Sequence, residues 1–171
     1  LHVDSKILHL APERGLQKLL KKKYKNYVDA DLYMDDVLIK NCNIHRLPFY
    51  NESFDFIICS HVLEHVDDDI KALNEINRVL KKSGIAIIMV PIILMDENFE
   101  DEEISNSLST YERINRFGQI DHVRTYSPIG FKKKLLNNFH IKILDENNFG
   151  KKFSKKCGFE NFKLYICSKK L

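Results

Sequence analysis

The sequence is poor in the features that mark metal knuckles, disulfide scaffolds and membrane spans. Its four cysteines lie far apart without a C-x-x-C pair, which argues against both a zinc knuckle and a disulfide framework. The longest apolar run, Ile85 to Leu94, contains Pro91 and is shorter than the roughly 20 residues that cross a bilayer. We therefore expect no integral membrane span, and with no signal peptide in view a reducing cytoplasm is the simplest location. The first residue is Leu1 rather than Met, which is compatible with a fragment of a longer chain.

A large excess of charge of one sign is also absent. Lys and Arg number 27 against 24 Asp and Glu, which leaves a net charge of +3 with His neutral. This is too slight to predict a nucleic-acid footprint. Local clusters are basic at 21–23 and 151–156 and acidic at 96–103, and we interpret them as solvated helix ends and loops. With 44% hydrophobic residues over 171 positions, the chain has the composition of one globular domain.

Strand and helix patterns alternate along the chain. Strands are expected at 6–10, 27–32, 42–44, 54–59, 84–90, 140–144 and 162–167. Helices are expected at 16–23, at 68–82 with Gly84 after its end, and at 131–136 after a start at Ser127-Pro128. This order predicts an α/β domain of three layers with a mostly parallel sheet. The last two strands, joined by a loop, predict an antiparallel C-terminal hairpin.

Residues 95–126 interrupt this alternation, because they are polar, acidic and without a clear period. An interruption of this length inside a compact domain is usually a lid or a binding insertion.

Ligands of open α/β sheets bind beyond the carboxyl ends of the strands, so the candidate site lies there. The first such turn, His9 to Gly15, has only Ala11 and Gly15 as small residues and is a weak glycine motif. Asp31 follows the first strand by about 20 residues, where a carboxylate commonly accepts hydrogen bonds from ribose hydroxyls. A solvated strand end is the alternative for Asp31.

Ser60 to His65 is the densest chemical cluster, directly after the clearest strand. A histidine there can act as base or acid. One alternative is that His61 and Glu64 only orient the following turn. Another is that Glu64 and His65 form a divalent-metal site with His122, although our main expectation includes no metal.

Gly118 to Arg124 closes the insertion and combines Asp121, His122 and Arg124. We interpret this segment as part of a site, with the alternative that Arg124 pins the insertion by an Arg–carboxylate pair. Nearby side chains could form a pocket for an anionic substrate or could instead form salt bridges with the acidic residues 96–103; they are Tyr111, Arg113, Arg116 and Phe117.

Two longer stretches, 47–66 and 75–84, resemble the class I S-adenosylmethionine-dependent methyltransferases. A subgroup is closer still, because its first turn reads like residues 9–13 (HLAPE) and its insertion ends like residues 116–126 (RFGQIDHVRTY). The resemblance implies a Rossmann-like, seven-stranded sheet with a reversed last strand, and S-adenosyl-L-methionine as cofactor.

The resemblance also implies a position for each part of the cofactor. Its methionine end would lie against the first turn, its ribose against Asp31, its adenine against Asn43 and Ile44, and its sulfonium against Ser60 and His61. The first-turn residues are His9, Leu10, Ala11 and Glu13. Two residues depart from the family pattern: Asn43 replaces an Asp of many relatives, and Glu13 replaces a glycine and could crowd the methionine carboxylate.

The expected activity is O- or N-methylation of a small polar acceptor such as a sugar, with His65 or His122 as the base and Arg124 orienting the acceptor. A cofactor-binding or partner-binding module without catalysis is the first alternative. A nucleic-acid methyltransferase is the second. It is disfavoured because Ser60-His61-Val62-Leu63 stands where an Asn/Asp-Pro-Pro-Tyr/Phe motif is common in enzymes that modify the amino groups of bases.

Overall fold

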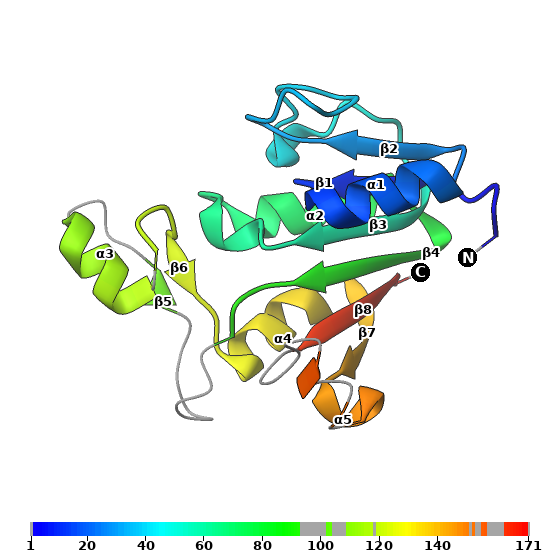
Figure 1. Cartoon of the computed structure of the whole chain (residues 1–171). Helices are drawn as coiled ribbons and strands as arrows, with labels where there is room; N and C mark the ends of the chain where they lie inside the picture. The colour runs from blue at the N-terminus through cyan, green and yellow to red at the C-terminus, as the bar shows by residue number, and fades with distance from the viewer. Residues whose placement is uncertain are drawn as a thin grey trace.

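The computed structural model describes residues 2–92, 102–103, 109–117, 119–150, 152, 155–156 and 163–170. Within them, six strands form one mixed sheet in the order β2-β1-β3-β4-β8-β7 (Figure 1). The four parallel strands are β1 (Ile7–Leu10), β2 (Tyr27–Ala30), β3 (Phe54–Ser60) and β4 (Leu80–Met89). The last two strands, β7 (Phe139–Leu144) and β8 (Leu164–Lys169), pair antiparallel with each other, and β8 pairs antiparallel with β4. The predicted α/β fold with its C-terminal hairpin is therefore confirmed.

Successive side chains of each strand point to opposite faces of the sheet. Both faces therefore present apolar side chains, and helices cover both. On one face Ile7 packs with Leu20 of α1 (Arg14–Lys23), together with Tyr24 and Tyr27. On the other face the larger core joins the alternate strand residues to α2 (Asp69–Val79) and α4 (Pro128–Leu136). Both of these helices begin at a capping residue: the side chains of Asp68 and Ser127 accept hydrogen bonds from backbone N–H groups of the first turn.

The predicted strand at 42–44 is wrong. Ile39 forms only an isolated bridge with Ala30, and the chain then turns into the 3-10 helix η1 (Ile44–Arg46). The Asn43 side chain accepts a hydrogen bond from the His45 N–H at 2.8 Å, which caps this turn and competes with a strand. The main sheet of the described residues therefore has six strands rather than seven.

The end of the helix predicted at 68–82 also needs correction. The helix ends at Val79, and Leu80 already pairs with Phe54 as the first residue of β4. The register then shifts, since Phe56 pairs with Ile85. Gly84 lies inside this irregular part of β4, where an added Cβ atom would lie 2.7 Å from Leu80 Cδ1. The glycine thus permits a close contact within the strand and does not end the helix.

The insertion has regular structure of its own. It contains α3 (Thr110–Phe117), and β5 (Glu102–Glu103) pairs antiparallel with β6 (Arg124–Thr125). Figure 1 shows these elements beside the sheet rather than on either face of it. Most of the acidic stretch 96–103, Gly118 and part of the basic stretch 151–156 lie outside the described residues.

Two short elements complete the fold: the 3-10 helix η2 (Leu63–His65) after β3 and the single-turn α5 (Glu146–Phe149) after β7. In the described part of the chain, the helices are all too short or too polar to cross a membrane.

Candidate active site

A pocket of about 530 Å³ opens at the carboxyl ends of β1, β2 and β3. Six of the residues predicted to bind a cofactor line it: Leu10, Ala11, Asp31, Asn43, Ile44 and His61. Two of them hold the backbone in the left-handed region, Ala11 with φ of 46° and His61 with φ of 53°. Such conformations are uncommon outside glycine and gather at functional sites. The first turn therefore makes a glycine-type bend with an alanine.

The rim of this first pocket is fixed by Asp31 at the end of β2. Its Oδ1 atom accepts hydrogen bonds from the backbone N–H groups of Tyr33 and Met34, both at 2.6 Å. The Asp31 backbone also bonds Ile39 and Cys42. The carboxylate is thus held in place at the pocket, where a hydroxyl-bearing ligand can reach it.

His9 lies beneath the first turn rather than in the pocket. Its ring is fully buried, and Nδ1 accepts a hydrogen bond from the Tyr27 hydroxyl at 2.8 Å while Nε2 donates to Glu13 Oε2 at 3.0 Å. The bond from His9 lowers the pKa of Glu13 to about 2 despite partial burial. The His9 ring is therefore enclosed by Tyr27 and Glu13, and contact of His9 with a cofactor stays a prediction.

Glu13 and Ser60 are also absent from the residues that line the first pocket. Because Glu13 stands where the family often has a glycine, its side chain was expected to crowd the crevice. It is instead hydrogen-bonded to His9 and does not line the first pocket. Ser60 ends β3 and is 9% exposed. Direct contact of these two side chains with a ligand in this pocket has no support in the geometry.

A second pocket, of about 420 Å³, adjoins the first and shares His61 and His65 with it. Its other lining residues are Glu64, Pro91, Phe117, Gln119 and His122. His61 Nδ1 lies 3.1 Å from Glu64 Oε1, and this hydrogen bond raises the pKa of His61. The His65 and His122 rings meet edge to face with centroids 4.7 Å apart. The cluster predicted from the sequence is thus brought together with His122 from the insertion.

The hydrogen bonds of the two rings define which nitrogen faces the pocket. His122 Nδ1 donates to the Phe117 carbonyl at 2.9 Å, and His65 Nδ1 lies 3.2 Å from Asp121 Oδ2. Each Nδ1 therefore has an acceptor, which leaves Nε2 of both rings to meet a ligand.

Arg124 lines neither pocket, and its role in orienting an acceptor stays a prediction. It is 3% exposed, and its guanidinium donates to the carbonyls of Leu63 and Val66, and to that of Asp67. Its Nε atom also lies 3.9 Å from Asp69 Oδ2. These contacts fit the alternative interpretation, in which the Arg124 side chain holds the insertion against η2 and α2. Of the four residues suggested for an anionic pocket, only Phe117 lines either pocket.

Several lining residues were not predicted from the sequence. The loop after β2 contributes Leu32, Tyr33, Cys42 and His45, and the turn after β3 contributes Val62, Val66 and Asp67. Most of them follow a strand end by a few residues, which is the signal that could have found them, whereas Cys42 and His45 lie much farther beyond the end of β2.

A methyltransferase domain family matches residues 6–88, the segment that runs from before β1 to the end of β4. The fold agrees with solved structures over nearly the whole chain. The YcgJ protein of Bacillus subtilis has a TM-score of 0.62 at 14% identity and covers 99% of this chain and 94% of its own. A SAM-dependent methyltransferase of Archaeoglobus fulgidus has a TM-score of 0.60 at 18% identity, covering 98% of this chain and 86% of its own.

Curated relatives match a shorter part of the chain. An uncharacterized protein of Methanocaldococcus jannaschii is 39% identical over 71 residues, 42% of this chain and 30% of that protein. A tRNA U34 carboxymethyltransferase of Campylobacter fetus is 38% identical over 71 residues, 42% of this chain and 24% of that protein. The matched segments thus span about a quarter to a third of these relatives.

The methyltransferase domain match includes β1, β2 and β3, whose ends form the first pocket, and it also includes Glu64 and His65. His122 lies beyond it. The second pocket therefore combines residues inside the matched segment with residues of the insertion.

Proposed function

We propose that the chain is an S-adenosyl-L-methionine-dependent methyltransferase that modifies a hydroxyl or amino group of a small polar molecule, such as a sugar. Two adjoining pockets that share His61 and His65 carry this proposal. Methyl transfer needs two ligands side by side, with the acceptor atom in line with the sulfonium at close range. A cofactor in the first pocket and an acceptor in the second would meet at the shared histidines.

The residues of the first pocket suit the cofactor. Its volume of about 530 Å³ lies within the usual range for ligand pockets. Ile44, Leu10 and Val62 supply apolar surface for an adenine ring, and Asp31 supplies a fixed carboxylate for ribose hydroxyls. When bound, the cofactor supplies an electrophilic methyl group: the S–CH3 bond breaks, the acceptor lone pair forms the new C–O or C–N bond, and S-adenosylhomocysteine remains.

The histidines of the second pocket would take the proton that the acceptor loses. In the neutral His122 ring, the hydrogen bond to the Phe117 carbonyl holds the proton at Nδ1, so Nε2 carries the lone pair. His65 has the same arrangement toward Asp121. A positioned base of this kind contributes about 10²–10⁴-fold to a proton transfer.

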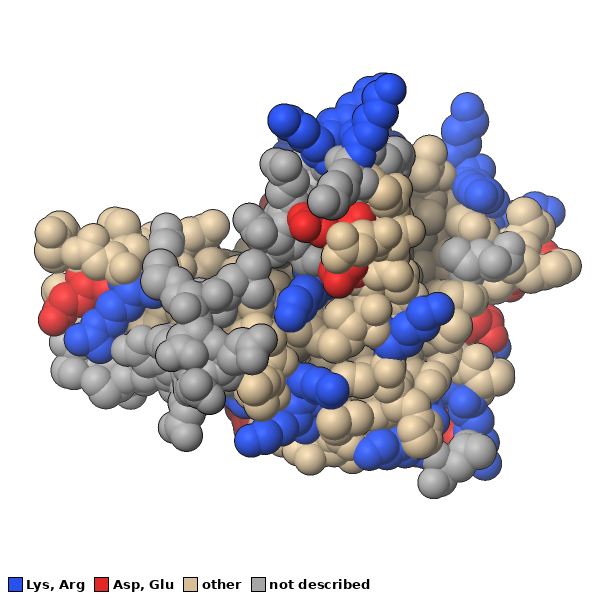
Figure 2. All heavy atoms as spheres, turned by 90° about the horizontal axis from the view of Figure 1, so that it is seen from below, with Lys and Arg blue, Asp and Glu red and all other residues tan. Residues whose placement is uncertain are grey.

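Polar lining favours a polar acceptor. Gln119 and the histidines can donate to or accept from hydroxyl groups, whereas Phe117 and Pro91 offer limited apolar surface. Lys and Arg side chains lie spread over the face seen in Figure 2 and do not gather into one stripe. A net charge of +3 also gives little support for a nucleic acid as acceptor, because nucleic acids bind through clustered positive charge. We also expect a cytoplasmic location, which free, buried Cys42, Cys59 and Cys167 support.

Calorimetric titration with S-adenosylmethionine and S-adenosylhomocysteine tests the cofactor assignment. We expect binding of both compounds. We expect Asp31→Ala to weaken this binding at least about tenfold, because the variant loses one charge-assisted hydrogen bond to the ligand. Asp35→Ala is the matched control, because Asp35 is exposed and lines neither pocket. No binding to the folded wild-type chain would contradict the proposal.

Turnover is tested separately by incubating the chain and cofactor with a panel of sugars, polyols and amines. We expect S-adenosylhomocysteine and a methylated product, both detected by mass spectrometry. Cofactor binding without either product for any acceptor would favour the catalytically inactive module.

A further inference from the structure

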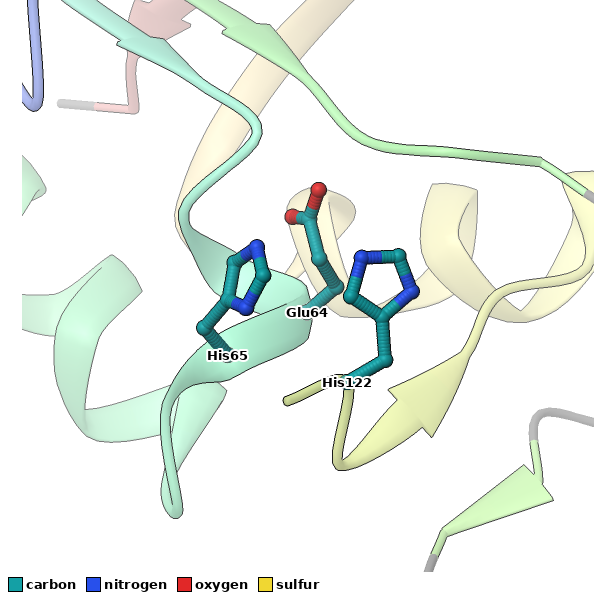
Figure 3. Close-up of side chains that lie close together, drawn as sticks. All are labelled: Glu64, His65 and His122. Atoms are coloured by element: carbon teal, nitrogen blue, oxygen red, sulfur yellow. The ribbon is translucent and has the colours of Figure 1, made fainter. Parts of the chain in front are cut away.

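Glu64, His65 and His122 form a compact group of three potential metal ligands. One donor atom from each residue lies within 4.8 Å of the other two. Figure 3 shows one nitrogen of each ring pointing toward the Glu64 carboxylate, with Glu64 and His65 coming from η2 and His122 from the segment before β6. A tetrahedral ion with bonds of about 2.0–2.1 Å holds its ligands roughly 3.4 Å apart. Closing the group around an ion thus needs side-chain shifts of about 1 Å.

The Glu64 carboxylate points to a ligand independently of this proximity. Glu64 is 1% exposed, and only Oε1 has a hydrogen-bond partner, His61 Nδ1 at 3.1 Å. Oε2 is buried and has no hydrogen-bond partner among the described residues. A buried carboxylate oxygen without a partner is costly, so an unpartnered one needs an explanation. A cation bound at Oε2 supplies it.

Both imidazoles are oriented as metal ligands usually are. A ligating histidine almost always donates its second ring N–H to a carbonyl or a carboxylate, which fixes the ring and its tautomer. His122 does this through the Phe117 carbonyl at 2.9 Å, and His65 through Asp121 Oδ2 at 3.2 Å. Nε2 is then the nitrogen of each ring that can coordinate a metal.

The backbone that carries the three residues is held together independently of any ion. Val123 N–H donates to the Glu64 carbonyl at 2.8 Å, and Arg124 donates to the carbonyls of Leu63, at the start of η2, and Val66, just after it. The Tyr126 hydroxyl donates to the Leu63 carbonyl at 3.1 Å. The insertion is therefore fastened to η2 on either side of the group, and the site is pre-arranged.

We propose that Glu64, His65 and His122 bind a divalent transition-metal ion, for which Zn²⁺ is the best fit. Two imidazoles and one carboxylate are the ligand set of several catalytic zinc sites, which keep a further position for water or substrate. Mg²⁺ and Ca²⁺ are poor candidates because they prefer oxygen ligands. The second pocket, of about 420 Å³, leaves room for that further ligand.

Ion binding engages the same Nε2 atoms that we assigned to proton transfer. In the metal-loaded protein, the ion would promote loss of the acceptor proton by lowering the pKa of a bound hydroxyl group. The metal site does not depend on the cofactor, so its test needs neither S-adenosylmethionine nor turnover.

The experiment is calorimetric titration of the full chain, stripped of metal by a chelator, with Zn²⁺, Co²⁺ and Mg²⁺. We expect one Zn²⁺ per chain at micromolar affinity or tighter, similar stoichiometry for Co²⁺, and no comparable binding of Mg²⁺. The visible spectrum of bound Co²⁺ should indicate nitrogen and oxygen ligands without a thiolate. No stoichiometric binding of Zn²⁺, or a Co²⁺–thiolate band, would overturn the proposal.

Three variants locate the site. Glu64→Gln and His122→Ala should each weaken Zn²⁺ binding by more than about 100-fold, and Asp121→Asn by about 10–100-fold because it orients His65. His140→Ala, on β7, is the matched control and should bind as the wild type does. Circular dichroism checks that each variant folds; because Asp121 is exposed, its variant remains informative if a buried one does not fold. Unchanged binding in the folded Glu64 or His122 variant would overturn the proposal.

Discussion

His9 Nε2 lies 3.0 Å from Glu13 Oε2, so a fully buried histidine and a half-exposed carboxylate are joined across the first turn. The Tyr27 hydroxyl completes this chain of hydrogen bonds at His9 Nδ1. Glu13 thereby stabilises the turn from outside the pocket, although the family pattern would place a glycine there.

This relationship predicts how stability depends on pH. The hydrogen bond from His9 lowers the folded-state pKa of Glu13 from 4.5 to about 2. A carboxylate with a lowered pKa stabilises the fold fully above its unfolded-state pKa, and this contribution is lost as pH falls through the folded-state value. We expect wild type to be more stable than Glu13→Gln at pH 6, with the difference shrinking between about pH 4.5 and 2.

Urea unfolding of both proteins across this pH range measures the difference. Asp35→Asn is the control, because Asp35 is exposed and makes only a surface ion pair with Lys40. A constant difference between wild type and Glu13→Gln from pH 6 to pH 2.5 would contradict the role of His9.

The positions of the pocket residues could be predicted because strand ends can be predicted. Asp31 and His61 each follow a buried run whose polar boundary is visible in the sequence, and parallel strands bring such ends to one edge. The directions of side chains could not be predicted in the same way. Arg124 lies on a strand of two residues, too short for a period to show which way its guanidinium points.

Local competition explains the remaining errors. The sequence 42–44 is apolar enough for a strand, but the Asn43 side chain stabilises a turn instead. The family resemblance implied that His9 contacts the cofactor, but a resemblance does not show that the His9 ring is buried against the Tyr27 hydroxyl.

Arg124 has a structural role, which predicts a large loss of stability. Arg124→Ala would remove the donor of the Val66 and Asp67 carbonyls and would leave the Leu63 carbonyl with the Tyr126 hydroxyl alone. Hydrogen bonds that involve a charged group contribute about 1.5–3 kcal/mol each, so we expect a loss of at least about 3 kcal/mol. Chemical denaturation measures it, and Arg46→Ala, at an exposed position, should change stability by less than about 0.5 kcal/mol. A stable Arg124→Ala variant with reduced turnover alone would restore the acceptor-orienting role.

Asp29, which the sequence did not single out, connects α1 to the loop after β2. It is fully buried and accepts hydrogen bonds from the Gln17 side chain and the Leu38 N–H, and its Oδ2 lies 2.7 Å from Lys21 Nζ. Burial raises its pKa, but these partners outweigh burial and lower it overall. We expect Asp29→Ala to cost about 2–4 kcal/mol and to weaken cofactor binding, because the released loop lines the first pocket.

Asp55→Ala is the matched control for this prediction. Asp55 also accepts from a lysine and a backbone N–H, but it lies near the start of β3, away from both pockets. It should lose stability without losing affinity for the cofactor in calorimetric titration. Equal effects of the two variants on affinity would show that the Asp29 effect is global.

His122 predicts a separation of turnover from cofactor affinity. His122 lines the second pocket and not the first, so His122→Gln should lower the rate of methyl transfer by about 10²–10⁴-fold while cofactor affinity stays within about twofold. Single-turnover kinetics and calorimetry measure the two quantities. If both fell together, His122 would act on the fold of the site and not on the acceptor.

Ala11 tests whether the turn is strained and close to the cofactor. Its φ of 46° costs an L-residue about 1–2 kcal/mol, which glycine avoids at an entropic cost of about 0.5–1 kcal/mol. Ala11→Gly should therefore change stability by less than about 1 kcal/mol. Ala11→Val should be destabilising, because a β-branched side chain tolerates this region poorly, and should also weaken cofactor binding by narrowing the first pocket.

Asn41 provides the comparison that separates the two effects of Ala11→Val. Its φ of 53° is similar, but it does not line the first pocket. Asn41→Val should therefore lose stability while cofactor affinity is retained. Both valine variants carry the same kind of backbone penalty, but only Ala11 lines the first pocket. A drop in cofactor affinity confined to Ala11→Val would therefore place the cofactor against the first turn. Retained affinity in that variant would move the cofactor away from β1.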